Sequence, residues 1–220
     1  MRGALIAAAA LLAAGSALAE DYVTHSFSST AARGSIRRVV IDVPAGDVKL
    51  RNGAGDRINV TGSVKRDYDD DREKQQRVVD DISVEIYVSP TEAVVRRKLG
   101  PRAHSWNARN NSDYRIVVEV PIGIDVAVET KYGEVEIDGN FGSLTCDLRA
   151  GEIHATLPRE TVKDLSASVR VGEVHASVGD RRIDNEGVFP RAAKWTNPSG
   201  GHSSVNLHTT AGEVHVTLKP

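Results

Sequence analysis

Three glutamates and three histidines recur in one short pattern in the C-terminal part of the chain. The segments AGEIHATL, VGEVHASV and AGEVHVTL each contain a glycine, a glutamate, an apolar residue and a histidine in that order. The side chains repeated in this way belong to Glu152, His154, Glu173, His175, Glu213 and His215. Imidazole and carboxylate groups act as general acids and bases, and they are also ligands for zinc and copper. The pattern therefore suggests acid–base chemistry, metal binding or a purely structural repeat.

The residues around each pattern alternate between apolar and polar, which is typical of β-strands. Counted from the glycine, apolar or small residues stand at positions −7, −5 and −3 and again at +2, +4 and often +6. Five copies share this register, and they are centred on Gly46, Gly133, Gly151, Gly172 and Gly212. Three copies follow one another at intervals of 18 and 21 residues, which predicts solenoid coils made of two short strands and a bend.

The glycine of each copy stands where the coil must turn. Such a corner often needs a positive φ, which glycine adopts at little cost. The inward positions carry small residues such as Ala155, Ala167 and Ala176, which fit a narrow interior. Cys146 is the only cysteine, so no intramolecular disulfide can form, and we expect its inward thiol to pack as a small, inert hydrophobe.

Residues 52–125 depart from the repeat and read as an insertion. Alternation predicts four strands there, at Arg57–Lys65, Ile82–Val88, Glu92–Leu99 and Tyr114–Val120. The middle two strands form a hairpin across Ser89-Pro90. The charge pattern of Asp69–Asp81 predicts a short surface helix, and Ala103–Ser112, which includes Trp106, reads as a polar loop.

The segment 179–203 also departs from the repeat. The interval of 40 residues from Gly172 to Gly212 could hold a further coil, but Gly179 to His202 lacks alternation and is rich in proline and glycine, so we expect an excursion loop. The final coil, Ser204–Leu218, would then stack directly on the coil of Gly172. An end strand without a cover favours pairing with another chain, so this order predicts end-to-end self-association.

The first residues have the features of a secretory signal peptide. Arg2 precedes the apolar run Ala4–Ala14, and Ala17-Leu18-Ala19 supplies the small residues before a cleavage site. We expect residues 1–19 to be removed and residues 20–220 to form a single exported domain, periplasmic or extracellular. No later apolar run reaches the roughly 18 residues of a membrane-spanning helix. The net charge of −2 gives no broad basic surface for nucleic acid.

The segment VEVPIGIDVAVETKYGEVEIDG (Val118–Gly139), followed by GSLTCDLRAGEI and the later copies, resembles the bacterial putative-adhesin family. The resemblance extends from about Val39 to Leu218. It implies an all-β fold, a right-handed parallel β-solenoid, with the hairpin and short helix as an insertion near the N-terminal part. It also implies an exported or membrane-linked domain of unassigned function. The matching motifs are structural, so the resemblance implies no catalytic residues.

The outward positions form columns along the predicted stack. Position +1 carries Asp47, Glu134, Glu152, Glu173 and Glu213, and position −2 carries Lys131, Arg149 and Arg170. Because equivalent residues of stacked coils lie about 4.8 Å apart, carboxylates in a column repel one another. We therefore expect the −2 bases to pair with them across the corner. The histidines at +3 fall in one row, which we interpret first as solvated surface, then as a protein or glycan contact, and last as a metal set.

Two functions from different classes fit these residues. The first is a non-catalytic exported β-solenoid of the cell envelope, an adhesin or a protein or glycan interaction module that presents its flat face or the 179–203 loop to a partner. The alternative is a polysaccharide hydrolase or lyase that uses glutamate and histidine of the outer face. The chain has no Walker loop, H-E-x-x-H or G-x-S-x-G motif. We favour the first function, without cofactor or metal, and take the six residues of the repeated pattern as the candidate interaction surface.

Overall fold

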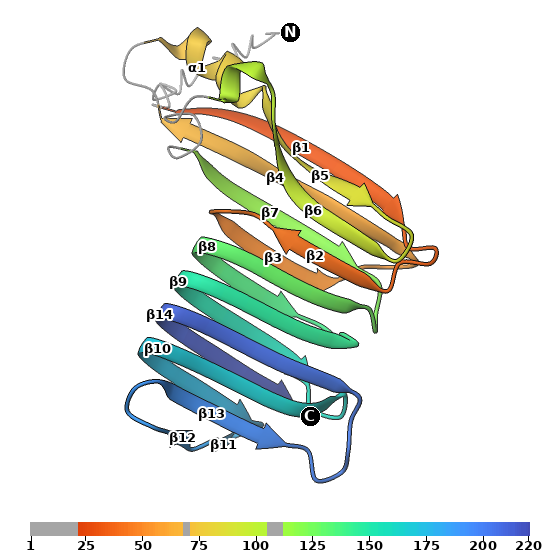
Figure 1. The fold of residues 1–220 in the computed structure, drawn as a ribbon, viewed down its shortest axis with the longest axis vertical. Helices are drawn as coiled ribbons and strands as arrows, with labels where there is room; N and C mark the ends of the chain where they lie inside the picture. The colour runs from red at the N-terminus through yellow and green to blue at the C-terminus, as the bar shows by residue number, and fades with distance from the viewer. Residues whose placement is uncertain (1–21, 68–70, 105–111) are drawn as a thin grey trace, which may run out of the picture.

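The structure is a computed structural model that describes residues 22–67, 71–104 and 112–220. The predicted signal peptide, the acidic residues Asp69 and Asp70 and the loop around Trp106 lie outside the described residues. Figure 1 shows an elongated stack of strands that cross the long axis obliquely. The strands near the middle of the stack carry the repeated pattern.

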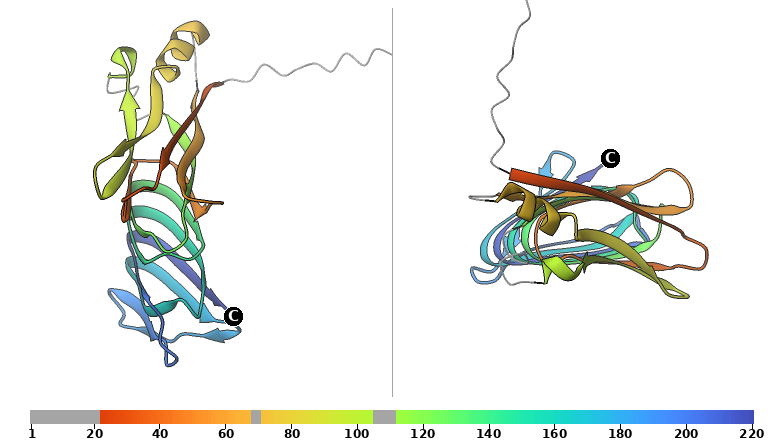
Figure 2. Two further views of the ribbon diagram at one scale, coloured as in Figure 1. Left: turned by 90° about the vertical axis from the view of Figure 1, so that its right-hand side faces the viewer. Right: turned by 90° about the horizontal axis from the view of Figure 1, so that it is seen from above.

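Five coils form the middle of the stack. In stacking order their strands are β2 (Arg38–Asp42) with β3 (Asp47–Asn52), β8 (Asp125–Asp138), β9 (Ser143–Pro158), β14 (Ser203–Lys219) and β10 (Val162–Val178). In the last four coils one continuous strand passes through both sides of the coil and bends at the repeat glycine. Seen from above, the coils form flattened rings (Figure 2). Each coil therefore contributes one half to each of two facing layers.

Neighbouring coils pair in parallel, in the register predicted from the alternation. Gly133 pairs with Gly151, Gly151 with Gly212 and Gly212 with Gly172. The predicted order of the coils is only partly right, because β14 lies between β9 and β10 instead of beyond β10. All the coils share one apolar pattern, so the pattern determines how two coils align but not which coils are neighbours.

The insertion strands extend the stack at its N-terminal end. They are β4 (Arg57–Asp67), β5 (Ile82–Val88), β6 (Glu92–Leu99) and β7 (Asp113–Val120), and they confirm the four predicted strands. Strand β6 adds to β2 and is followed by β5, whereas β7 adds to β3 and is followed by β4 and then by β1 (Tyr22–Ala32). The helix α1 (Arg72–Val79) lies within its predicted segment, and a short 3₁₀ turn, η1 (Pro101–Ala103), follows β6.

The strand directions at this end correct the expectation of a parallel solenoid. Pairs β1–β4, β4–β7 and β5–β6 are antiparallel, whereas β6 pairs in parallel with β2 and β7 in parallel with β3, so the sheet is mixed. The hairpin across Ser89-Pro90 explains one of these pairs, because a short connection between adjacent strands makes them antiparallel. The fold is all-β and solenoid-like, and the right-handed sense of the coils stays a prediction.

Residues 179–203 cap the opposite end of the stack. They contain β11 (Arg181–Arg182), β12 (Asn185–Glu186) and β13 (Arg191–Thr196). Strand β13 pairs antiparallel with the first half of β10, and β11 pairs with its second half. The expected excursion loop is therefore wrong, since a strand at the end of a stack can pair through its backbone without strict alternation. The last coil is interior and β10 is covered, so the basis for end-to-end self-association through the last coil is also wrong.

Apolar side chains fill the space inside the coils, and the repeat glycines sit at their bends. Those glycines have φ between 112° and 139°, as predicted. A Cβ atom on Gly151 would overlap the carbonyl oxygen of Gly133, and one on Gly212 would overlap that of Gly151. Glycine thus lets the backbones of neighbouring coils approach closely at the bend. Cys146 is fully buried at its inward position, and burial raises the pKa of its thiol far above the usual range, which keeps it protonated.

Candidate functional site

The three histidines of the repeated pattern form one row on the outer face of the coils' second halves. The register pairs His154 with His215 and His215 with His175. The rings of His154 and His215 stack with centroids 4.8 Å apart and planes 7° apart, and those of His215 and His175 stack at 4.8 Å and 19°. The predicted row is confirmed, with His215 at its centre because β14 lies between the other two coils.

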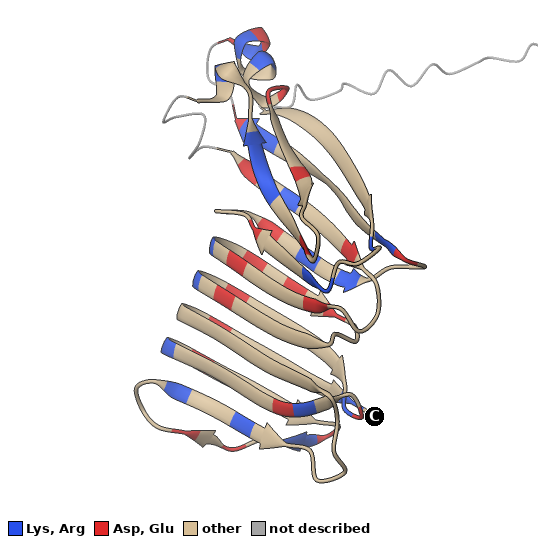
Figure 3. Cartoon of the chain, turned by 45° about the vertical axis from the view of Figure 1, so that its right-hand side comes forward, with Lys and Arg blue, Asp and Glu red and all other residues tan. Residues whose placement is uncertain are grey.

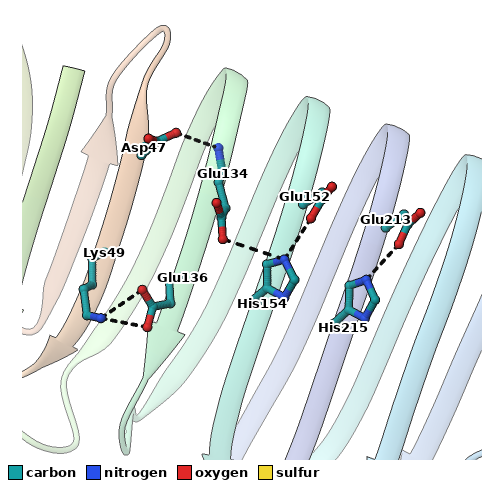
Figure 4. A network of polar contacts seen from close by, with 8 residues as sticks. All are labelled: Asp47, Lys49, Glu134, Glu136, Glu152, His154, Glu213 and His215. Atoms are coloured by element: carbon teal, nitrogen blue, oxygen red, sulfur yellow. Dashed lines mark hydrogen bonds and ion pairs between the residues drawn. The ribbon is translucent and has the colours of Figure 1, made fainter. Parts of the chain in front are cut away.

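Each histidine contacts the glutamate two residues before it. Residues i and i+2 of a strand project from the same face, so this contact follows from the spacing of the sequence pattern. Figure 4 shows two of the pairs and the neighbouring coils. The distances between histidine Nε2 and the nearest glutamate oxygen are 3.0 Å for His154–Glu152, 2.9 Å for His215–Glu213 and 3.2 Å for His175–Glu173.

The predicted pairing of these glutamates with the −2 bases is wrong. Within the described ranges, Lys131, Arg149 and Arg170 form no ion pair with the glutamate column. Figure 3 shows basic residues at the bends of several coils, on the left edge of the stack. The chain reverses between positions −2 and +1, so the two side chains leave the coil in different directions.

One basic partner of the glutamate column comes from the cap. Arg191 on β13 places Nη1 3.4 Å from Oε1 of Glu173. Sequence reasoning missed this residue because it treated 179–203 as a loop away from the stack. The sequence gives only a weak signal for this contact. A single arginine in a segment without alternation indicates neither that the segment is a strand nor which strand it pairs with.

The +3 column, which carries the three histidines, has a different composition toward the N-terminal end of the stack. Lys49 on β3 places Nζ 2.8 and 2.9 Å from the two carboxylate oxygens of Glu136 on β8 (Figure 4). Two residues earlier in each strand, the Asp47 carboxylate accepts a hydrogen bond of 3.4 Å from the backbone N–H of Glu134. The sequence places Lys49 and Glu136 at position +3 of adjacent copies, and their opposite charges are the signal that could have predicted the pair.

The glutamate and histidine side chains lie on an open face. The three histidine side chains are 35–39% exposed and their glutamate partners 46–55%. Four cavities of 330–620 Å³ are lined by other residues, among them Arg96, Tyr114, Trp195 and Asn197. A ligand of this face would therefore contact a surface and not enter a cleft.

One part of the row brings three donor atoms together across two coils. His175, Glu213 and His215 each place one nitrogen or oxygen within 4.8 Å of the others. Among the described residues this is the one group of three histidine, cysteine or acidic side chains at that spacing. The group combines two imidazoles and a carboxylate, so it can accept hydrogen bonds, exchange protons or coordinate a cation.

Most of the chain matches the model of a known family. The model of the Toastrack DUF4097 family matches residues 30–217. The chain belongs to the Toastrack DUF4097 family. This membership confirms the resemblance predicted from the repeat, and the function of Toastrack DUF4097 domains is unassigned. A search of curated proteins finds no match.

Solved structures match this Toastrack chain over most of their length. A putative cell adhesion protein from Clostridium sporogenes matches with a TM-score of 0.50 and 9% identity, over 90% of this chain and 100% of that one. A putative adhesin from Parabacteroides distasonis matches with a TM-score of 0.28 and 8% identity, over 87% and 97% of the two chains. A putative lipid binding protein from the same organism matches with 0.24 and 10%, over 89% and 97%. The first of these supports the fold.

The described part of the chain contains one α-helix, α1, of eight residues. No helix there has the length and apolar character needed to cross a lipid bilayer.

Proposed function

We propose that this protein is a non-catalytic, exported interaction module of the cell envelope, an adhesin that binds a protein or glycan through the outer face of its coils. The observation that carries the proposal is the row of half-exposed glutamate–histidine pairs on β9, β14 and β10. Backbone pairing holds this row in register, so it presents the same donors and acceptors at regular intervals. Such a surface suits an extended partner that makes the same contact several times.

Two further observations support this proposal. The N-terminal residues have the features of a signal peptide, which would place the domain outside the cytoplasm. A solved structure of the same fold is called a putative cell adhesion protein. Both agree with a domain whose partner lies in the envelope or on another cell.

The position of the pairs favours binding over hydrolysis. Glycoside hydrolysis uses carboxyl groups on both sides of a bound sugar, in a site that excludes bulk water. The six candidate side chains lie on an open face, and the four cavities described above are formed elsewhere. We therefore propose the histidines and glutamates as contact residues.

The test measures capture from an envelope extract of the producing cell by the purified, immobilised protein. One variant combines His154→Ser, His175→Ser and His215→Ser. Its matched control combines Thr145→Ala, Ser166→Ala and Asn206→Ala, which lie on the same three coils in their first halves. A third variant, Val188→Ser with Phe189→Ser, changes the exposed tip of the cap, where these side chains are 71% and 74% exposed.

We expect the histidine variant to lose its captured partner and the other two variants to retain it. Equal capture by all variants would contradict the proposed face. Loss with the cap variant alone would place the contact on residues 179–203. Release of soluble sugar from envelope polysaccharide by the intact protein, abolished in the histidine variant, would support the hydrolase or lyase instead.

A further inference from the structure

The row of imidazoles has a chemical property that a general contact surface does not need. His175 on β10 and His215 and Glu213 on β14 each place one donor atom within 4.8 Å of the others, across the pairing of these two strands. We propose that these three side chains bind a divalent transition metal ion, zinc in the first instance. The site does not depend on the proposed function, because it rests on donor geometry alone.

The donor set is chemically suited to zinc. Zinc accepts neutral imidazole and carboxylate ligands at about 2.0–2.2 Å in tetrahedral geometry, which places donor atoms about 3.3 Å apart. His215 Nε2 and the Glu213 oxygen are already 2.9 Å apart. The third donor lies within 4.8 Å of both, so rotation of half-exposed side chains completes the set. Three protein ligands leave a fourth position, which faces solvent and takes water or a ligand atom of a partner.

The charges around the row favour this position over its neighbours. The next carboxylate of the +1 column, Glu173, forms an ion pair with Arg191 at 3.4 Å. The arginine competes with a metal ion for this carboxylate, so Glu173 is a weaker metal ligand than Glu213. Among the residues that the structure describes, Glu213 forms an ion pair with His215 and with no lysine or arginine. Toward β9, His154 faces two carboxylates, at 3.0 Å from Glu152 and 3.8 Å from Glu134. The same distance limit yields no second group of three within the described ranges.

The backbone under the site is already in place before any metal binds. Gly172 and Gly212 pair in register at the bend, three residues before the two histidines, and a Cβ on Gly172 would overlap the carbonyl oxygen of Gly212. Strand pairing then continues through Val178 and Leu218, beyond both histidines. Because the strands hold their register on both sides, metal binding orders only three side chains, which limits its entropic cost.

Titration with zinc alone tests the site. The protein is produced without a polyhistidine tag, freed of metal with a chelator, and titrated calorimetrically with Zn²⁺. We expect one zinc ion per chain, and a loss of affinity of more than about tenfold for each of His215→Ala, His175→Ala and Glu213→Gln. The matched control is His208→Ala, which removes another histidine of β14 that contacts Ser168 instead of a carboxylate. We expect it to bind zinc like the unchanged protein.

A second measurement separates coordination from loose association. Co²⁺ bound by nitrogen and oxygen ligands in a tetrahedral site absorbs visible light more strongly than octahedral, hydrated Co²⁺. We expect such absorption with the unchanged protein and with His208→Ala, and its loss with Glu213→Gln. Far-UV circular dichroism of each variant establishes that its strands are intact. Failure of the unchanged protein to bind zinc, or equal losses in the His208 and His215 variants, would overturn the proposal.

Discussion

The two ends of the +3 column use one backbone position in opposite ways. On β3 and β8 the column carries Lys49 and Glu136, whose charges meet at 2.8 Å. On β9, β14 and β10 it carries three stacked imidazoles, whose nearest carboxylates lie on their own strands. The pairing of the strands is parallel and in register at both ends. The difference therefore comes from the side chains alone.

One repeated position can thus link coils in one part of the stack and present a binding surface in another. An ion pair between coils satisfies its charges within the protein and leaves little for a ligand. The imidazole row keeps its donors on the surface, and the carboxylates beside it contact imidazole rings instead of a lysine. The Lys49–Glu136 end of the column thus links two coils. The histidine end offers its side chains to a partner or a metal, except for Glu173, which pairs with Arg191.

The largest effect should come from the backbone that both ends share. Replacing Gly212 with alanine places a Cβ against the carbonyl oxygen of Gly151 at a φ of 134°. We expect Gly212→Ala to lower the free energy of unfolding by about 3 kcal/mol or more, from backbone strain and overpacking together. Urea unfolding followed by circular dichroism measures this change.

The control for this substitution is Gly55→Ala. Gly55 also has a positive φ, 81°, but a Cβ there would meet nothing within 4 Å. We expect a cost of about 1 kcal/mol, from strain without overlap. Equal costs for the two variants would show that close approach at the bend is not what the repeat glycine provides.

The next largest effect converts the ion-paired end into the imidazole end. In the double variant Lys49→Thr with Glu136→His, β8 carries a new imidazole two residues after Glu134 and beside His154 of β9. This copies the arrangement of Glu213, His215 and His175. We expect the variant to bind two zinc ions per chain where the unchanged protein binds one, measured by equilibrium dialysis and elemental analysis.

Its matched control is Lys49→Thr with Ser28→His. Ser28 pairs with Thr61, and the residues two positions away on β1 are Ser26 and Thr30, so a histidine there has no carboxylate in the place that Glu134 takes on β8. One zinc ion per chain is expected. A second ion in this control would mean that any added surface histidine binds zinc. The difference between the two ends of the column would then not depend on the neighbouring glutamate and histidine.

The sequence predicted the coils well because their signal is local. Alternation around Gly133, Gly151 and Gly172 specifies which side chains face inward, and the glycine specifies the bend, so the register and the histidine row followed. The order of the coils could not be predicted in this way. Strand β14 presents the same apolar pattern as β10, and its place beside β9 depends on the path of residues 179–203.

In the candidate site, too, contacts within one strand could be predicted from the sequence, and contacts between segments far apart in the chain could not. The contacts between each histidine and the glutamate two residues earlier are set by strand geometry and could be predicted from spacing. The partner of Glu173 could not, because Arg191 approaches from a cap strand whose pairing carries no sequence pattern. The expected role of Arg149 and Arg170 failed because one-dimensional spacing ignores the reversal of the chain at the bend.

The smallest effect concerns the ion pair itself. Lys49 and Glu136 are 44% and 49% exposed, and surface pairs of this kind contribute about 1 kcal/mol or less, with weaker interaction at high salt. We expect Lys49→Met to lower the free energy of unfolding by less than about 1 kcal/mol in low salt, and by less still in 1 M NaCl. A double-mutant cycle with Glu136→Gln, followed by urea unfolding, isolates the interaction between the two side chains.

Lys49 lies on β3, and β8 and β9 separate it from β14. Zinc affinity should therefore be unchanged in Lys49→Met; a clear change would mean that the two ends are coupled through the column and do not act as separate surfaces.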